Sequence, residues 1–180
     1  MSATDALRND HRQIRRLEKI ITHCYTKLYA GDTIPFSDIE KMVIIMSEFL
    51  DAIHYSREED AYFPCVASYG SLKDEIRAFM IEHEFSRRIA GIIARHLQNW
   101  KEGKDDRESV ARFLKAYAVY LNDHITKEEK FFDKAESQVL SQEEEKMIYE
   151  EFRAVTAVVT KLDEMIKSLD SLEQAHWMKS

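Results

Sequence analysis

The chain is poor in the residues that interrupt helices. Its 180 residues include only four glycines and two prolines. Because these residue types end helices and form turns, their scarcity predicts a few long helices joined by short connections. Long alternating runs of β-branched residues are also absent, which argues against strands. We therefore expect an all-α protein, with a hydrophobic fraction of 44% that is sufficient for a buried core.

Other absences exclude whole classes of function. The chain has 26 basic and 33 acidic residues, so it lacks the basic excess that binds nucleic acid or anionic lipid. No apolar run approaches the length that spans a bilayer, and residues 1–5 do not resemble a signal peptide. Cys24 and Cys65 form neither a CxxC motif nor a disulfide framework, and we interpret them as small hydrophobic residues. The expectation is a cytoplasmic protein with no nucleic-acid or membrane partner.

Apolar residues recur at helical spacing along the whole chain. This spacing, with Gly31, Gly70 and Gly103 each following a helix, predicts helices at about residues 4–30, 35–69, 71–102, 105–135 and 141–169. Ser141-x-x-Glu144 reads as a capping box before the last helix, and Ser71-x-x-Asp74 as a weaker version before the third. Pro64 is expected to kink or end the second helix.

Three further features of these helices lead to separate expectations. Gly91 lies inside the third helix, where it costs about 1 kcal/mol relative to alanine, so we expect either a close helix–helix approach or simple tolerance. The amphipathic helix at 141–169 is interpreted as a cover on the bundle or as a dimer surface. The tail around His176 and Trp177 is expected to fray.

One pattern occurs twice in the sequence. Residues 10–21 and residues 82–93 both read acid-His-x-x-x-Arg-Arg-aliphatic-x-x-Ile-Ile. Downstream of each copy stands His-x-x-x-Glu-Glu, beginning at His54 and at His124. The offsets between corresponding histidines are 83 − 11 = 72 and 124 − 54 = 70. The chain thus repeats the order of a single histidine followed by His-x-x-x-Glu.

This repeat predicts a site for two metal ions. Residues four apart lie on one face of a helix, so each His-x-x-x-Glu directs an imidazole and a carboxylate into the same space. These faces otherwise point toward the core, where unpaired polar groups are costly. The six candidate metal ligands are His11, His54, Glu58, His83, His124 and Glu128.

Six protein ligands are too many for one tetrahedral zinc ion. They suit two metal ions with two histidines each and both carboxylates bridging, which leaves room for a solvent bridge and a small ligand. Mixed imidazole and carboxylate donors fit iron, and manganese or zinc are weaker candidates. A ferritin-like site is disfavoured because the chain has no Glu-x-x-His motif.

Side chains near the candidate ligands receive weaker interpretations. Glu59 and Glu129 are turned away by one residue and are assigned to the surroundings of the metals or to the surface. Arg15 and Arg87 follow the single histidines by four residues and either pair with these acids or the two bridging glutamates, or stay solvated.

Apolar and aromatic residues share the faces that carry the histidines. Buried tyrosines are expected to be core residues first, with donation to a bound ligand or electron relay as the alternative; they are Tyr55, Tyr62, Tyr117 and Tyr120. In the third helix, the residues expected to surround His83 are Ile76, Phe79, Met80 and Ala90.

The order His, His-x-x-x-Glu, His, His-x-x-x-Glu resembles the hemerythrin-like HHE cation-binding family. Residues 58–64 are also similar to the EE-x-x-[LY]-F-P segment common in that family. The resemblance covers about residues 4–135. It implies an up-down-up-down four-helix bundle around a non-haem di-iron centre held by the six candidate ligands. We accordingly divide the chain into a metal-binding bundle at residues 1–137 and an additional C-terminal helix and tail at residues 138–180, packed on the same domain.

One departure from the family bears on function. Oxygen-carrying hemerythrins have a fifth histidine four residues after the third, and Arg87 occupies that position here. The set of four histidines and two glutamates resembles that of iron-sulfur repair di-iron proteins, and it argues against reversible oxygen carriage. The resemblance implies a protein that binds or reacts with O2, NO or H2O2, with catalase-like, NO-handling and oxygen-activating reactions left open.

Three alternatives also stay open at this point. The protein could be an iron or oxygen sensor that acts through a partner, with the C-terminal helix as the contact or as a homodimer surface. It could donate iron for iron-sulfur cluster repair. The simplest alternative is a bundle whose core histidines are hydrogen-bonded to neighbours and hold no metal.

Overall fold

The computed structural model describes residues 1–154 and 156–179, except for the side chains of residues 156–159. Within these residues the chain is helical and contains no strand. Four long helical segments form the bundle: α1 (Ala3–Ala30); a second segment composed of α2 (Phe36–Ile45), η1 (Met46–Tyr55), η2 (Glu58–Tyr62) and α3 (Phe63–Ser68); α4 (Lys73–Lys101); and α5 (Arg107–Gln138). The C-terminal part contains α6 (Gln142–Ala154), α7 (Thr156–Glu173) and α8 (His176–Lys179).

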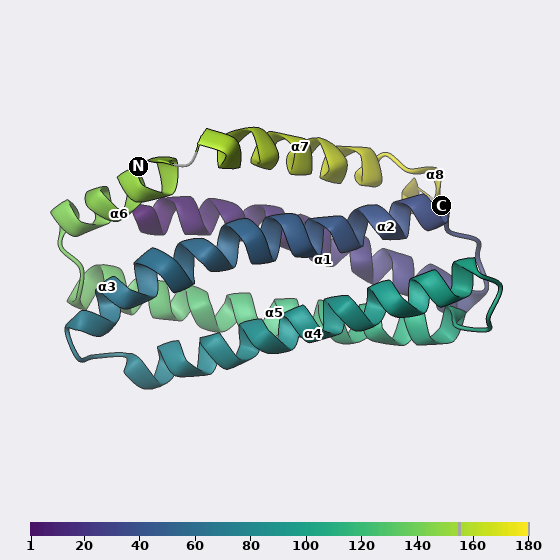
Figure 1. The fold of residues 1–180 in the computed structure, drawn as a ribbon, viewed down its shortest axis with the longest axis horizontal. Coiled ribbons are helices and arrows are strands. Elements are labelled where there is room, and N and C mark those ends of the chain that lie inside the picture. Colours follow the sequence, from purple (N-terminus) through teal and green to yellow (C-terminus); the bar gives the residue numbers. More distant parts are fainter. Residues whose placement is uncertain (155, 180) are drawn as a thin grey trace.

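The four segments run alternately up and down, joined by short turns, with α6 and α7 along one side (Figure 1). The helix α5 packs against both α1 and α4, while α2 and η1 pack against α4. This arrangement confirms the expected all-α, up-down bundle with additional helical structure at its C-terminus.

Local sequence signals explain most of the helix ends. Ser2 and Asp5 form a capping box at the start of α1, and Gly31 ends that helix in the left-handed conformation with φ 94°. The predicted capping box of Ser141 and Glu144 is confirmed by hydrogen bonds in both directions. The predicted cap at Ser71 is wrong, because Leu72 occupies the N-cap position with φ 57° and no side-chain cap bond forms there.

The second bundle segment is unusual because two stretches of it are π-helical. The segment does not end at Pro64, as one reading of the sequence predicted, but continues to Ser68. Pro64 lies in the first turn of α3, directly after the wide turns of η2, where a missing backbone N–H costs little. Single π-helical turns often mark functional sites, and His54 and Glu58 lie in η1 and η2.

The C-terminal part covers the bundle. The predicted single helix at 141–169 is two helices in the structure, and Val155 and the side chain of Val159, two of its apolar positions, lie outside the described residues. Buried side chains on α6 and α7 face the bundle; they are Ile148, Phe152, Met165, Leu169 and Leu172. The guanidinium of Arg16 on α1 also donates to both carboxylate oxygens of Glu173. The sequence suggested that this region is either a cover on the bundle or a dimer surface, and the observed packing supports the cover.

The predicted fraying of the tail is wrong. Trp177 is only 6% exposed, and its indole nitrogen donates to Asp38 at 2.9 Å. The ring also lies 6.1 Å from the ring of His23. Burial of a large aromatic side chain with a satisfied N–H anchors α8 on the bundle.

Two expectations for α4 are corrected as well. Met80 does not surround His83 but is 39% exposed, because it lies one residue beyond the buried face that Phe79 and His83 define. At Gly91 an added Cβ would meet nothing within 4 Å, so no close helix–helix approach requires a glycine there. The structure therefore supports the second alternative, that α4 simply tolerates the glycine.

Candidate metal centre

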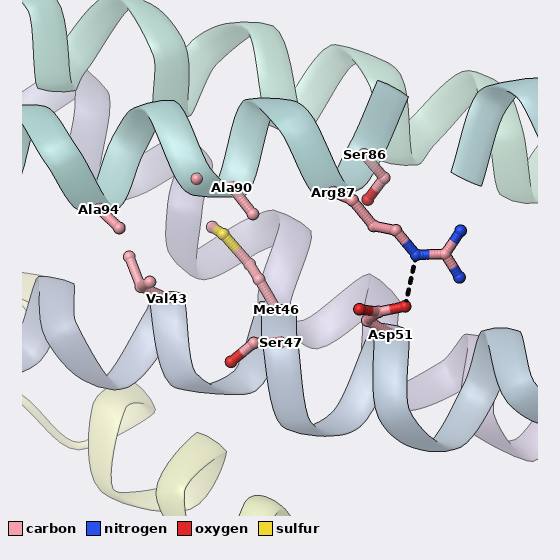
Figure 2. A pocket seen from close by; sticks show the side chains of 9 residues that line it. Val43, Met46, Ser47, Asp51, Ser86, Arg87, Ala90 and Ala94 are labelled. Carbon is pink, nitrogen blue, oxygen red and sulfur yellow. Dashed lines mark hydrogen bonds and ion pairs between the residues drawn. The ribbon is translucent and has the colours of Figure 1, made fainter. Parts of the chain in front are cut away.

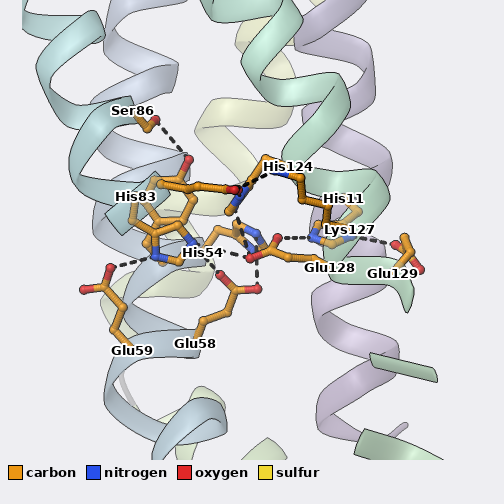
Figure 3. A network of polar contacts seen from close by, with 12 residues as sticks. His11, His54, Glu58, Glu59, His83, Ser86, His124, Lys127, Glu128 and Glu129 are labelled. Carbon is orange, nitrogen blue, oxygen red and sulfur yellow. Dashed lines mark hydrogen bonds and ion pairs between the residues drawn. The ribbon is translucent and has the colours of Figure 1, made fainter. Parts of the chain in front are cut away.

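The structure brings all six candidate ligands to one place in the middle of the bundle (Figure 3). His11 comes from α1, His54 and Glu58 from η1 and η2, His83 from α4, and His124 and Glu128 from α5. Each of these six residues is at most 2% exposed. The two large apolar clusters of the core lie on either side of them along the bundle axis. The centre is thus a polar layer inside an otherwise apolar core.

Glu128 lies between three imidazoles. Its carboxylate oxygens are 3.2 Å from Nε2 of His11, 3.1 Å from Nε2 of His124 and 3.4 Å from Nε2 of His83. Glu58 lies between two, at 3.6 Å from Nε2 of His54 and 3.4 Å from Nε2 of His83. Both carboxylates therefore reach histidines from the two halves of the sequence repeat, as bridging groups would.

Two overlapping groups of donors have the spacing of metal ligands. The first is His11, His54, Glu58 and Glu128, and the second is His83, His124 and Glu128. Within each group the donor atoms lie within 4.8 Å of one another. The histidines divide two and two, one pair from each copy of the repeat.

A carboxylate faces the outer nitrogen, Nδ1, of every site histidine. Glu129 lies 2.6 Å from Nδ1 of His11 and Glu59 lies 2.7 Å from Nδ1 of His83. These acids therefore stand behind the single histidines, one of the two places that the sequence suggested for them. Carboxylates in this position fix the ring orientation of metal-binding histidines and make them better donors.

Sequence reasoning missed the equivalent partners of the other two histidines. Glu82 lies 2.8 Å from Nδ1 of His124, and Asp10 lies 3.6 Å from Nδ1 of His54. Both acids immediately precede a single histidine in the repeated pattern. That repeated acid was the signal that could have identified them.

The arginines of the repeat behave differently from each other. Arg87 donates to Asp51 at 2.7 Å and to both oxygens of Glu59 at 3.0 and 3.1 Å, so it supports the carboxylate behind His83. Arg15 instead bonds Asn122 and Thr126 on α5, away from the centre. Arg87, at the position of the fifth histidine of oxygen carriers, thus points to the acids beside the centre.

The electrostatics of the buried groups are unfavourable without a cation. Burial, together with the charge of Glu128, raises the pKa of Glu58 well above its ordinary value. Burial lowers the pKa of His54 to about 4. Burial also opposes charge on His124, yet Glu128 and Glu82 raise its pKa to about 9. Burial opposes charge on Glu128 too, but His124, His11 and His83 lower its pKa well below the ordinary value, so the pKa values of the two buried carboxyl groups are shifted in opposite directions.

The inward-facing atoms identify what the centre lacks. Nε2 of all four histidines and both carboxylate oxygens of Glu58 and Glu128 are buried and have no hydrogen-bond partner. Buried polar atoms are almost always satisfied, and eight in one layer demand a partner that accepts lone pairs from nitrogen and oxygen. Metal ions fit this donor set.

Tyrosine rings stack against two of the site imidazoles. Tyr55 stacks on His83 with ring centroids 3.8 Å apart, and Tyr120 stacks on His124 at 5.1 Å. The hydroxyl of Tyr55 donates to Ser86 at 3.0 Å and lies 3.1 Å from that of Tyr120, while Ser86 lies 3.0 Å from the hydroxyl of Tyr117. The tyrosines are core residues whose hydroxyls satisfy one another beside the centre.

A surface cleft of about 350 Å³ approaches this hydroxyl cluster between the second segment and α4 (Figure 2). Small residues of α4 and apolar residues of α2 and η1 line most of it; they are Ala90, Gly91, Ala94, Val43 and Met46. The ion pair of Arg87 and Asp51 stands at one end, next to Ser86. The buried Ser86 lines the cleft and accepts a hydrogen bond from Tyr55, and the ring of Tyr55 stacks on His83.

Comparison with known proteins agrees with this geometry. The model of the hemerythrin HHE cation-binding domain matches residues 2–135. The chain belongs to the hemerythrin HHE cation-binding family. No curated protein and no solved structure matches it.

The matched region contains all six residues of the centre, so this hemerythrin-like protein has a buried His/Glu cluster suited to metal binding. Among the described residues, none of the helices is both long and apolar enough to cross a membrane.

Proposed function

We propose that the chain is a non-haem di-iron protein that binds or reacts with a small molecule such as O2, NO or H2O2. The eight unpartnered donor atoms of the buried layer are the observation that carries this proposal. His11 and His54 would hold one iron, and His83 and His124 the other, with Glu58 and Glu128 between them. Iron suits a mixture of imidazole and carboxylate donors better than zinc or manganese in this number.

A di-iron pair supplies electrons and open coordination positions to a small ligand. The residues of this chain supply the rest. Glu59, Glu82, Glu129 and Asp10 orient the four imidazoles, and the surrounding apolar clusters exclude water. The four imidazoles divide evenly, and Arg87 replaces the fifth. This even division supports ligand reaction or sensing over reversible oxygen carriage.

The first experiment is to measure metal identity and content in protein purified without added metal. We expect about two irons per chain, and a marked loss in the His54→Ala and His124→Ala variants. His23→Ala is the matched control, because His23 lies on α1 outside the centre and contacts Trp177. Full iron content in both ligand variants, or a single zinc in the wild type, would overturn the di-iron assignment.

One contact path favours a sensor as the second candidate. Asp10, which faces His54, accepts a hydrogen bond of 2.7 Å from Arg57, and the guanidinium of Arg57 lies 5.4 Å from the ring of Phe152 on α6. A change at His54 could reach the C-terminal cover, and through it a protein partner, by these contacts. Iron donation for cluster repair is a weaker candidate function, because the burial of all six ligand residues favours a metal ion that stays bound.

Hydrogen exchange of α6 distinguishes the two candidates. Under the sensor hypothesis, adding NO or O2 to the metal-loaded protein changes exchange in α6, and Arg57→Lys reduces that change. Rapid consumption of peroxide with unchanged exchange in α6 would instead support an enzyme.

A further inference from the structure

The outer face of α4 carries an apolar stripe that no part of the described chain covers. Ile81 is 66% exposed, Phe85 53% and Met80 39%. A groove of about 410 Å³ runs between these side chains and Arg77, Glu84 and Arg88. In Figure 1, α4 lies on the side of the bundle opposite α7, so the C-terminal cover does not reach this stripe. Exposed apolar clusters of this kind commonly mark association surfaces.

The exposed residues follow the spacing of a helix-pairing seam. Exposed side chains stand at intervals of four, three, four and three residues; they are Asp74, Ala78, Ile81, Phe85 and Arg88. This heptad spacing is how two helices pack along their length. We call these five residues the α4 seam.

The charges of the α4 seam select both the partner and its direction. Asp74 and Arg88 stand at equal distance from Ile81, seven residues on either side. In an antiparallel pair of identical seams, Asp74 of each copy meets Arg88 of the other and Ile81 meets Ile81. The small Ala78 lies within one residue of the position opposite the large Phe85. A parallel pair would place like charges together at both ends.

A second pair of charges lies close to the same symmetry. Arg77, four residues before Ile81, and Glu84, three residues after it, flank the seam, and the antiparallel arrangement brings Arg77 of one copy within one residue of the position opposite Glu84 of the other. Within one copy, Arg88 donates to Glu84 at 3.0 Å, and these side chains are 74% and 53% exposed. Replacing this exposed ion pair by contacts to the partner copy therefore costs little free energy. Twofold symmetry is the usual form of such self-complementary contacts.

We infer that the α4 seam is a homodimer interface in which two copies of this chain pack α4 against α4 in antiparallel orientation. The partner copy would lie over the His83 and His124 side of the metal centre. Phe85 of the seam already contacts the ring of Tyr120, which stacks on His124. The inference depends on surface residues alone and does not require the proposed di-iron function.

Sedimentation of the full chain over a range of concentrations tests association. We expect a monomer–dimer equilibrium, and at least a tenfold weaker association for Ile81→Glu, which places two carboxylates at the twofold axis. Val119→Glu is the matched control, because Val119 is 55% exposed on α5 outside the seam. A wild-type chain that stays monomeric to about 1 mM, or equal effects of the two substitutions, would overturn the inference.

Charge reversal tests the antiparallel orientation. Asp74→Arg and Arg88→Asp should each weaken self-association at least tenfold, because each creates two repulsive contacts. Mixed together, the two variants should form a heterodimer as strong as the wild-type dimer, since every Asp–Arg contact is restored. Circular dichroism should show unchanged folding, because both positions are exposed. A mixture that remains monomeric rejects the antiparallel seam.

Discussion

The two ring nitrogens of each site histidine have different surroundings. Nε2 points into the buried layer and Nδ1 faces a carboxylate, which is a hydrogen-bond partner for three of them and lies 3.6 Å away for His54. Of the outer carboxylates, Asp10 is buried and the other three are part-buried, and each is fixed by a cation, as Glu59 is by Arg87 and Asp10 by Arg57. At this scale the repeat supplies both the donors and the groups that aim them.

The carboxylate behind His83 provides a test of this arrangement. Glu59→Gln keeps the shape of the side chain but removes the charge that orients the imidazole and increases its basicity. We expect metal affinity to fall about 10- to 100-fold with the fold unchanged, measured by competition with a metal chelator.

Glu75→Gln is the matched control, because Glu75 pairs with Lys134 at the surface of the same α4–α5 side of the bundle. Equal affinities in the two variants would show that Glu59 does not act on the metal ligand.

At the scale of elements, the second bundle segment and α4 leave a cleft beside Gly91, where the sequence suggested either a close helix–helix approach or simple tolerance of the glycine. The π-helical turns of η1 and the small residues Ala90, Gly91 and Ala94 create this space. Because the cleft ends at Ser86, we expect it to be a path for a small ligand toward His83.

Filling the cleft should slow ligand association. Gly91→Leu places a branched side chain into the open space at that position. We expect stopped-flow measurements with NO to show association several-fold slower, at unchanged metal content.

Gly91→Ala is the control, because one methyl group leaves the cleft open and should stabilise α4 by about 0.5–1 kcal/mol. Unchanged association in Gly91→Leu would mean that the ligand arrives by another route, whereas absence of NO binding in the wild type would count against the proposed function instead.

The cover helix α7 is joined to α1 by a charge pair with a definite pH dependence. The hydrogen bonds from Arg16 lower the pKa of Glu173 below its ordinary value of 4.5. A lowered folded-state pKa means that the pair stabilises fully above about pH 4.5 and that this stabilisation is lost as the pH falls through the lowered pKa. Glu173→Gln should therefore cost about 0.5 kcal/mol at pH 7, and the cost should shrink in acid.

Urea unfolding at pH 7, 5 and 4 measures this difference. The control is Glu164→Gln, which changes an exposed acid on the same helix. A difference between wild type and Glu173→Gln that is the same at all three pH values would contradict the role of the charge pair.

At the scale of the whole molecule, the metal centre couples the four bundle segments. Its six residues come from every segment of the bundle, so a bound metal ion stabilises their assembly and not one helix alone. Without a cation, the buried carboxylates oppose folding.

Removing the metal should lower the melting temperature. A ligand present at one hundred times its dissociation constant stabilises the folded state by about 2.7 kcal/mol, which for a chain of this size corresponds to roughly 5–10 °C. Differential scanning calorimetry with and without a chelator measures this shift.

The His54→Ala and His124→Ala variants should show little further change with chelator. An identical melting temperature for the wild type with and without chelator would support a bundle whose histidines hold no metal.

Some features of this chain are local and could be read from its sequence. Helical spacing, Gly31, and the Ser141 capping box determine where helices begin and end, because their physics operates within one or two turns. The residues of the centre were also predictable, because His-x-x-x-Glu places two donors on one helix face and the repeat brings a second set.

Only the tertiary structure decided the contacts between helices. Asp10 and Glu82 stand behind histidines of other helices, and their partners depend on how the segments are rotated against one another. The same holds for the exposure of Met80 and the open space beside Gly91, since a shift of one residue on a helix turns a side chain by about 100°. Trp177 docks because Asp38, 139 positions earlier, accepts its indole hydrogen. Spacing along one helix is set by the sequence itself, whereas rotation and packing between helices arise only when all of them are assembled.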